Sequence, residues 1–165
     1  MSDDQLRPSR PVPTFGTLRL RVRYCECDPM GVVHHASFAP WLEMGRTELL
    51  REAGVSYAAL ESAGVFLVVT RLELRFRRPV RYDDVVEVRT RVESASRIKI
   101  RHSYEIALAE RAGRPVAELD PASDPTLPTP DASELGVCVV ASSELACVGA
   151  DARPRPLPDW LGESA

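Results

Sequence analysis

Three long segments with a strict two-residue alternation constrain the fold of this chain more than any other feature. Apolar residues alternate with mostly charged ones over 68–77, 86–93 and 97–108, and short stretches containing Pro79, Asp83 and Ser94 separate the segments. Period-two alternation is typical of strands that bury one face, and short turns join antiparallel neighbours. The sequence therefore predicts an antiparallel meander with one apolar face and one strongly basic face.

A helical pattern precedes these strands. From Phe38 to Ala53 apolar residues recur at three- and four-residue spacing, with Ser37 as the expected N-cap and Gly54 as the stop. Residues 18–23 alternate like a strand, and 136–149 are apolar enough for a last one. One long helix with a wide apolar stripe needs a sheet to cover it, so we expect an α+β domain.

The ends of the chain and one internal stretch differ in composition from the rest. We expect a disordered N-terminal tail over 1–16, a single domain over 17–160 and a C-terminal tail over 161–165. Residues 111–133 contain five prolines among aspartates and serines. Such a composition resists packing, so we interpret this stretch as a mobile insertion.

Composition narrows the classes of partner. The net charge of −3 disfavours binding to nucleic acid through bulk charge. No apolar run approaches the roughly 20 residues needed to span a bilayer, so no membrane partner is expected. The N-terminus lacks the apolar middle of a secretory signal, and the four cysteines show no C-x-x-C spacing. We therefore expect a cytoplasmic protein with reduced thiols and no metal site.

The stretch from Tyr24 to Phe38 carries the chemistry. Between the first predicted strand and the helix it places Asp28, Gly31 and two adjacent histidines, His34 and His35. Free N–H groups and the positive end of a helix dipole can stabilise an oxyanion close to such a carboxylate. Asp28 precedes a proline and also suits an ordinary turn. His35 could act through its side chain, through its backbone N–H, or only by packing.

A longer motif runs through this stretch and the helix. It comprises Tyr24, Glu26, Asp28, 31–33, 35–38, 41–43 and 46–48, and continues at 78–84 and 153–158. This motif resembles that of the hotdog-fold acyl-CoA thioesterases, in particular the branch of 4-hydroxybenzoyl-CoA thioesterase and YbgC. The resemblance implies a hotdog fold, in which a curved antiparallel sheet wraps one long helix, and a homodimer or homotetramer that hydrolyses acyl-CoA.

The resemblance also implies roles for single residues. Asp28 is the expected catalytic carboxylate, as nucleophile or as general base, and His35 marks the backbone N–H that polarises the thioester carbonyl. The expected substrate-binding residues are Tyr24, Gly31, Val33, His34 and Trp41, and the expected CoA-binding residues are Arg97, Lys99 and Arg155. No cofactor is expected, because coenzyme A is part of the substrate.

Several alternatives stay open at this point. Other hotdog branches place a catalytic glutamate on the long helix, which makes Glu43 and Glu48 rivals of Asp28. The family often carries Tyr or Phe where this chain has His34, and the insertion is unusual. The acyl group could be delivered by a carrier protein instead of CoA. A non-catalytic binder of acyl thioesters, with residues 111–133 docking a partner, is the alternative outside enzymes.

Overall fold

The computed structural model describes residues 6–120, 122–127 and 136–162. Its strands are β1 (Phe15–Arg21), β2 (Phe66–Phe76), β3 (Val85–Ala95), β4 (Lys99–Arg111), β5 (Arg114–Pro115) and β6 (Val137–Val148). Its helices are α1 (Phe38–Glu52), α2 (Tyr57–Ser62) and α3 (Asp159–Gly162), with short 3-10 helices at Tyr24–Glu26, His35–Ser37 and Val116–Glu118. None of the described helices is both long and apolar enough to cross a membrane.

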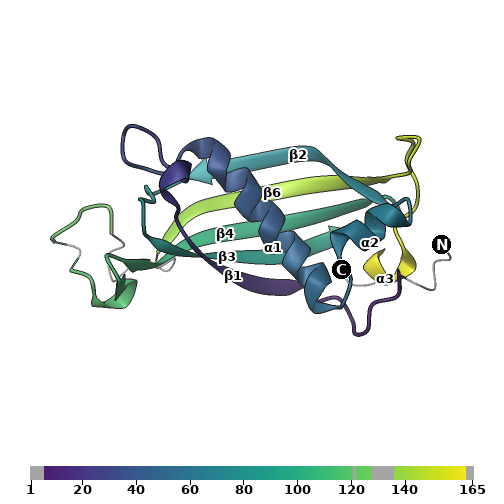
Figure 1. The fold of residues 1–165 in the computed structure, drawn as a ribbon, viewed down its shortest axis with the longest axis horizontal. Coiled ribbons are helices and arrows are strands. Elements are labelled where there is room, and N and C mark those ends of the chain that lie inside the picture. Colours follow the sequence, from purple (N-terminus) through teal and green to yellow (C-terminus); the bar gives the residue numbers. More distant parts are fainter. Residues whose placement is uncertain (1–5, 121, 128–135, 163–165) are drawn as a thin grey trace.

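The strands form one antiparallel sheet in the order β1-β3-β4-β6-β2, and β5 pairs with β4. Helix α1 crosses one face of this sheet (Figure 1). The predicted α+β architecture, with one long helix against long antiparallel strands, is confirmed. The predicted hairpin between β3 and β4 is confirmed as well.

The predicted meander is wrong for β2, which lies at the edge of the sheet beside β6 and not beside β3. The connection after β2 is longer than a tight turn and crosses the end of the domain. Along it, Val80 is 1% exposed and its carbonyl accepts from Val33 N–H at 2.8 Å, while Arg81 bridges to Val32. Val80 is thus buried beside the chain that precedes α1, on the connection that joins the edge strand β2 to β3.

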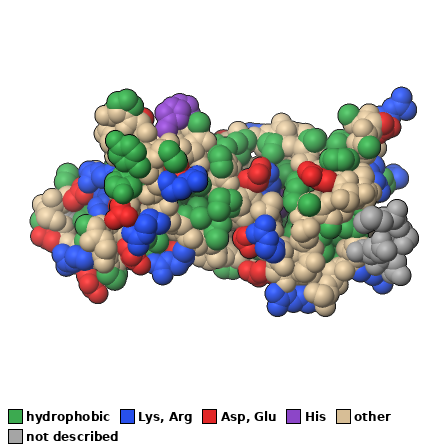
Figure 2. Space-filling view, viewed as in Figure 1, with side chains coloured by type: hydrophobic (Ala, Val, Ile, Leu, Met, Phe, Trp, Pro, Cys, Tyr) green, Lys and Arg blue, Asp and Glu red, His purple; other side chains and the backbone are tan. Residues whose placement is uncertain are grey.

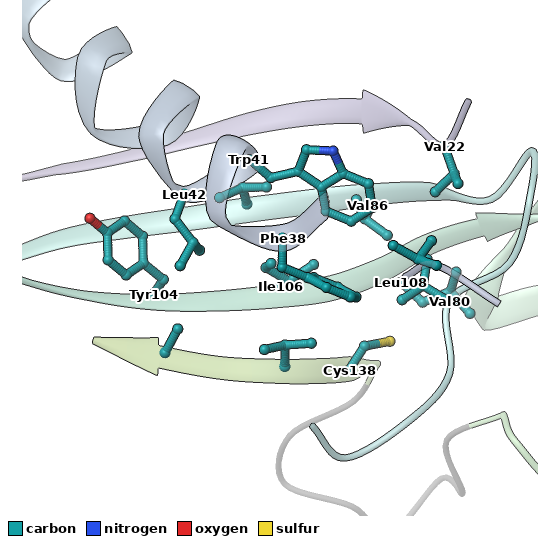
Figure 3. Packing of buried hydrophobic residues seen from close by; sticks show 14 of the residues in the cluster. Val22, Phe38, Trp41, Leu42, Val80, Val86, Tyr104, Ile106, Leu108 and Cys138 are labelled. Atoms are coloured by element: carbon teal, nitrogen blue, oxygen red, sulfur yellow. The ribbon is translucent and has the colours of Figure 1, made fainter. Parts of the chain in front are cut away.

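The core lies between α1 and the sheet. Phe38, Trp41 and Leu42 point from the first turns of α1 toward Val86, Ile106 and their neighbours on the strands (Figure 3). A Cβ built on Gly45 would lie 2.4 Å from Thr90 Oγ1, so the helix approaches the sheet more closely than a side chain would allow. The apolar stripe read from the sequence is the face that this contact buries.

The chain outside the predicted domain boundaries is partly packed. Leu6 and Val12 are 3% and 6% exposed and belong to a second core cluster, which includes Leu49 and Leu50 at the C-terminal end of α1. Leu161, within α3, is buried in the same cluster. The parts of the predicted tails and insertion at 1–5, 121, 128–133 and 163–165 lie outside the described residues.

Candidate active site

Asp28 lies in a small hairpin that joins β1 to α1. Cys27 pairs with Val33, and Asp28 N–H donates to Val32 O at 2.9 Å. The turn needs a positive φ, which Gly31 supplies at 78°. Asp28 Oδ1 accepts from Met30 N–H at 2.8 Å, while Oδ2 accepts no hydrogen bond from the described part of the protein. One carboxylate oxygen thus fixes the turn and the other is available for chemistry.

The helix begins with a 3-10 turn at His35–Ser37. Ser37 was predicted as the N-cap, but its backbone is already helical and its hydroxyl donates instead to Glu26 O at 3.1 Å. His34 caps the turn, because its Nδ1 accepts from Ala36 N–H at 3.2 Å. Among the described residues, His35 N–H has no acceptor. This N–H is therefore open to a ligand carbonyl.

Glu26 ties the hairpin to the helix. Its carboxylate, 7% exposed as a residue, accepts from Arg23 N–H at 2.7 Å, Arg23 Nη2 at 2.8 Å and Trp41 Nε1 at 2.9 Å. Burial raises the pKa of Glu26, but the hydrogen bonds from Arg23 and Trp41 outweigh it and leave that pKa below its ordinary value. Glu26 O also accepts from His34 N–H at 2.8 Å. A buried carboxylate thereby sets where the hairpin meets α1.

A cavity of about 370 Å³ opens beside Asp28 and His35, both of which line it. Its remaining lining comes from the hairpin, from α1, from the end of β2 and from the connection after it, and consists of six apolar residues and two arginines: Val32, Val33, Phe38, Phe76, Pro79, Val80, Arg77 and Arg78. The rings of Phe38 and Phe76 stand 5.3 Å apart in an edge-to-face contact. The cavity therefore joins a carboxylate and an open N–H to a wall of apolar side chains and two arginines.

The other predicted substrate-binding residues take different places. Val33 lines the cavity, and Gly31 shapes the turn. Tyr24 is 81% exposed and packs edge-on against Tyr82. His34 is exposed beside His35, and histidine side chains stand out at the end of the molecule where α1 begins (Figure 2). Trp41 lies in the core, 2% exposed, and its indole holds Glu26.

The predicted CoA-binding residues lie at the end of the sheet opposite to Phe76. Lys99 starts β4 opposite Ala146, and its Nζ donates to Glu144 at 2.6 Å. Arg155 Nη1 donates to Gly64 O at 2.8 Å. Arg97 is exposed, and its carbonyl accepts from the chain before α3. A single chain does not bring these residues together with Asp28.

The rival glutamates lie on the outer side of α1. Glu43, with a side chain 66% exposed, pairs with Arg46 at 3.2 Å, and Glu48 pairs with Arg51 one turn later. Both are ion pairs between residues three apart on one helix. This placement favours Asp28 over either glutamate as the reacting carboxylate.

The cavity wall at the end of β2 was not among the predicted site residues. The connection from β2 to β3 crosses the end of the domain. Only this crossing brings five residues to the hairpin: Phe76, Arg77, Arg78, Pro79 and Val80. Reading this connection as a tight turn hid that contact. The motif segment 78–84 indicated in the sequence that this connection matters. Its role follows only from the path that the connection between β2 and β3 takes in the structure.

Comparisons with known proteins identify the family to which the chain belongs. Residues 22–164 match the model of a family described as the thioesterase-like superfamily. The acyl-CoA thioester hydrolase YbgC of Escherichia coli O157:H7 is 35% identical over 91 residues, which are 55% of this chain and 68% of that protein. Matches to curated relatives span 50% to 68% of those proteins.

Solved structures match over most of the chain. A DHNA-CoA thioesterase from Staphylococcus aureus is 27% identical, with a TM-score of 0.68 over 89% of this chain and 86% of that one. A hypothetical protein, TT1821 from Thermus thermophilus, is 31% identical, with a TM-score of 0.68 over 90% of this chain and 95% of that one.

Proposed function

The chain belongs to the thioesterase-like superfamily, and we propose that it hydrolyses an acyl-CoA thioester to a free acid and coenzyme A. The predictions of the family and of the hotdog fold are confirmed. One observation carries the proposed activity: Asp28 and His35 line the same cavity, one with an open carboxylate oxygen and the other with an open N–H.

The reaction needs two things from this site. The N–H of His35 donates to the thioester oxygen and stabilises the negative charge that develops there. The Asp28 carboxylate either takes a proton from the attacking water or attacks the carbonyl carbon itself, forming an anhydride that water then opens. On both routes the C–S bond breaks, the thiolate takes up a proton, and water supplies the new oxygen of the acid. Coenzyme A leaves as product, and no cofactor takes part.

We further propose that the active unit is at least a homodimer formed through β2. This strand is at the edge of the sheet and exposes Val68, Val69, Leu72 and Phe76 to between 40% and 54%. An edge strand with exposed apolar residues is a template for pairing with a second chain. Phe76 also lines the cavity, so the pairing edge and the site are continuous.

Antiparallel pairing of two β2 strands has a consequence for CoA. It sets the Phe76 end of one strand beside the Phe66 end of the other. The end of the sheet with Arg97, Lys99 and Arg155 then lies next to the partner's cavity. Cationic side chains there can meet the phosphates of CoA, which a single chain keeps far from Asp28.

The experiment is thiol release by the wild-type protein from a panel of aliphatic and aromatic acyl-CoAs, with the same acyl groups on acyl carrier protein in parallel. Hydrolysis of at least one acyl-CoA at a rate well above the carrier-protein ester is the expected result. Hydrolysis of carrier-protein esters alone would reassign the substrate. Binding of a non-hydrolysable acyl-CoA thioether without turnover of any ester would contradict the enzyme and favour a binding protein.

A further inference from the structure

The described part of the insertion that follows β5 is docked at the same end of the domain as the cavity. Residues 116–118 form a 3-10 helix, and Val116 and Leu119 pack against the main core cluster. Leu127 is only 6% exposed and belongs to that cluster. The described part of the insertion, which was predicted to be mobile, therefore contributes to the core. Its composition alone does not predict this packing.

An ion-pair network holds the insertion in place. Asp124 Oδ2 accepts from Arg81 Nη1 at 2.8 Å and from Arg111 Nη1 at 2.9 Å. Asp124 Oδ1 accepts from the N–H and the hydroxyl of Thr126 at 2.9 and 2.6 Å. The hydrogen bonds from Thr126, together with the charges of Arg81 and Arg111, hold the pKa of Asp124 well below its ordinary value. Asp124 is thus a charged acceptor shared by two arginines.

The same network reaches the cavity wall. Arg111 also donates from Nη2 to Pro79 O at 3.3 Å and to Asp84 Oδ2 at 2.8 Å. The Arg81 N–H donates to Asp84 Oδ2 at 2.8 Å. These contacts fix the connection that contains Pro79 and Val80, both of which line the cavity. Through its ion pairs with Arg81 and Arg111, Asp124 therefore connects the insertion to the segment that forms the cavity wall.

Leu127 is buried in the core cluster that supplies part of that wall. It shares a buried cluster with Val33, Phe38 and Val80, and all three of these residues line the cavity, which Leu127 itself does not line. Interiors pack densely, so removing a buried leucine leaves space into which neighbouring side chains can relax. The space created by removing Leu127 would open within the cluster to which the lining residues Val33, Phe38 and Val80 belong.

We propose that Leu127 sets the depth of the acyl-binding cavity and that Asp124 is the positioning residue that keeps Leu127 and the wall in place. This inference rests on the proposed thioesterase function. It makes the insertion a determinant of acyl-group size, because the residues that it supports meet the acyl group and not the reacting carbonyl.

The test compares kcat/KM for short, medium and long straight-chain acyl-CoAs among wild type and single variants. Leu127→Ala should raise the ratio of long-chain to short-chain activity about tenfold, since a size change in an apolar pocket alters discrimination on that scale. Leu127→Phe should lower the ratio. Asp124→Asn should shift it in the direction of Leu127→Ala by a smaller factor.

The matched control is Asp120→Asn, within the same insertion. Asp120 is exposed, and its Oδ1 accepts from Ala122 N–H, a contact that asparagine can keep. This variant should leave the chain-length profile unchanged. An equal loss of activity at every chain length in the Leu127 variants would show a purely structural role and overturn the inference, as would an unchanged ratio. In either case an active wild type would leave the proposed function standing, whereas an inert wild type would overturn both.

Discussion

Trp41 Nε1 donates a hydrogen bond of 2.9 Å to Glu26 Oε1 in the core, and this contact joins the helix that starts the site to the loop that carries Asp28. Trp41→Phe keeps an aromatic ring but removes one of the two donors to the buried Glu26 Oε1, which also accepts from Arg23 Nη2 at 2.8 Å. We expect the variant to lose about 1–3 kcal/mol of unfolding free energy in urea titrations. Combined with Glu26→Ala, the two losses should fall short of additivity. Wild-type stability of Trp41→Phe would contradict this role.

Gly45 is expected to reject a side chain. Alanine is favoured over glycine inside a helix by about 1 kcal/mol, but its Cβ would lie 2.4 Å from Thr90 Oγ1. We expect Gly45→Ala to destabilise the protein by about 1–3 kcal/mol, because overpacking outweighs helix propensity. Thermal or urea unfolding measures the loss. Addition of Thr90→Ala should recover part of it, and a stabilised Gly45→Ala protein would be inconsistent with the close approach.

His102 should make stability depend on pH. Burial, and then repulsion by Arg46, lowers its pKa from 6.5 to about 4, and its ring stacks on Tyr104 with centroids 5.9 Å apart. The unfolded chain therefore binds a proton first, and stability falls as the pH drops from about 6.5 toward 4. Urea titrations should show a loss of about 2 kcal/mol between about pH 7.5 and pH 5 from this group. His102→Gln should lack that contribution, and an identical pH dependence in both proteins would refute it.

Val69 tests the proposed dimer. It lies on the edge strand β2 and is 48% exposed. Val69→Lys places a charge where a second β2 would pair, so we expect monomers in light scattering after size exclusion, with loss of thioesterase activity. Arg71→Gln, on the same strand, changes an exposed charge without burying one and should remain dimeric. A Val69→Lys protein that stays dimeric and active would place the interface elsewhere.

The sequence predicted the elements well because each rests on local pattern. Strict alternation marked the long strands, and the apolar stripe from Phe38 marked the helix whose buried face contains Trp41 and Leu42. The order of the strands within the sheet was harder to predict. Alternation does not specify which strands pair. Val68 and Val69 occupy adjacent positions of β2 and are both exposed, yet in the sequence they resemble the apolar residues of a buried strand. The connection from β2 to β3 contains Val80, and its burial beside the chain that precedes α1 is a tertiary contact that local pattern does not reveal.

In the candidate site, too, local features could be predicted from the sequence and tertiary contacts could not. Asp28, Val33 and His35 lie within one short loop, so their common cavity follows from local chain direction. Trp41 belongs to the same motif, but its ring turns into the core to bind Glu26, which no motif reveals. The docking of the insertion was also hidden, because Asp124 meets Arg81 from 43 positions away in the chain.

The central claim is that the Asp28 carboxylate performs the chemistry, and the most direct measurement is kcat of Asp28→Asn on the best acyl-CoA substrate. Asparagine can keep the contact with Met30 N–H through its amide oxygen, yet it can serve neither as base nor as nucleophile. The control is Asp83→Asn, at an exposed turn position with a φ of 67°.

We expect kcat of Asp28→Asn to fall by about a hundredfold to ten-thousandfold, with unchanged unfolding free energy and unchanged binding of an acyl-CoA thioether, while Asp83→Asn keeps wild-type rates. A kcat for Asp28→Asn equal to that of the wild type would contradict the assignment and return attention to Glu43 and Glu48.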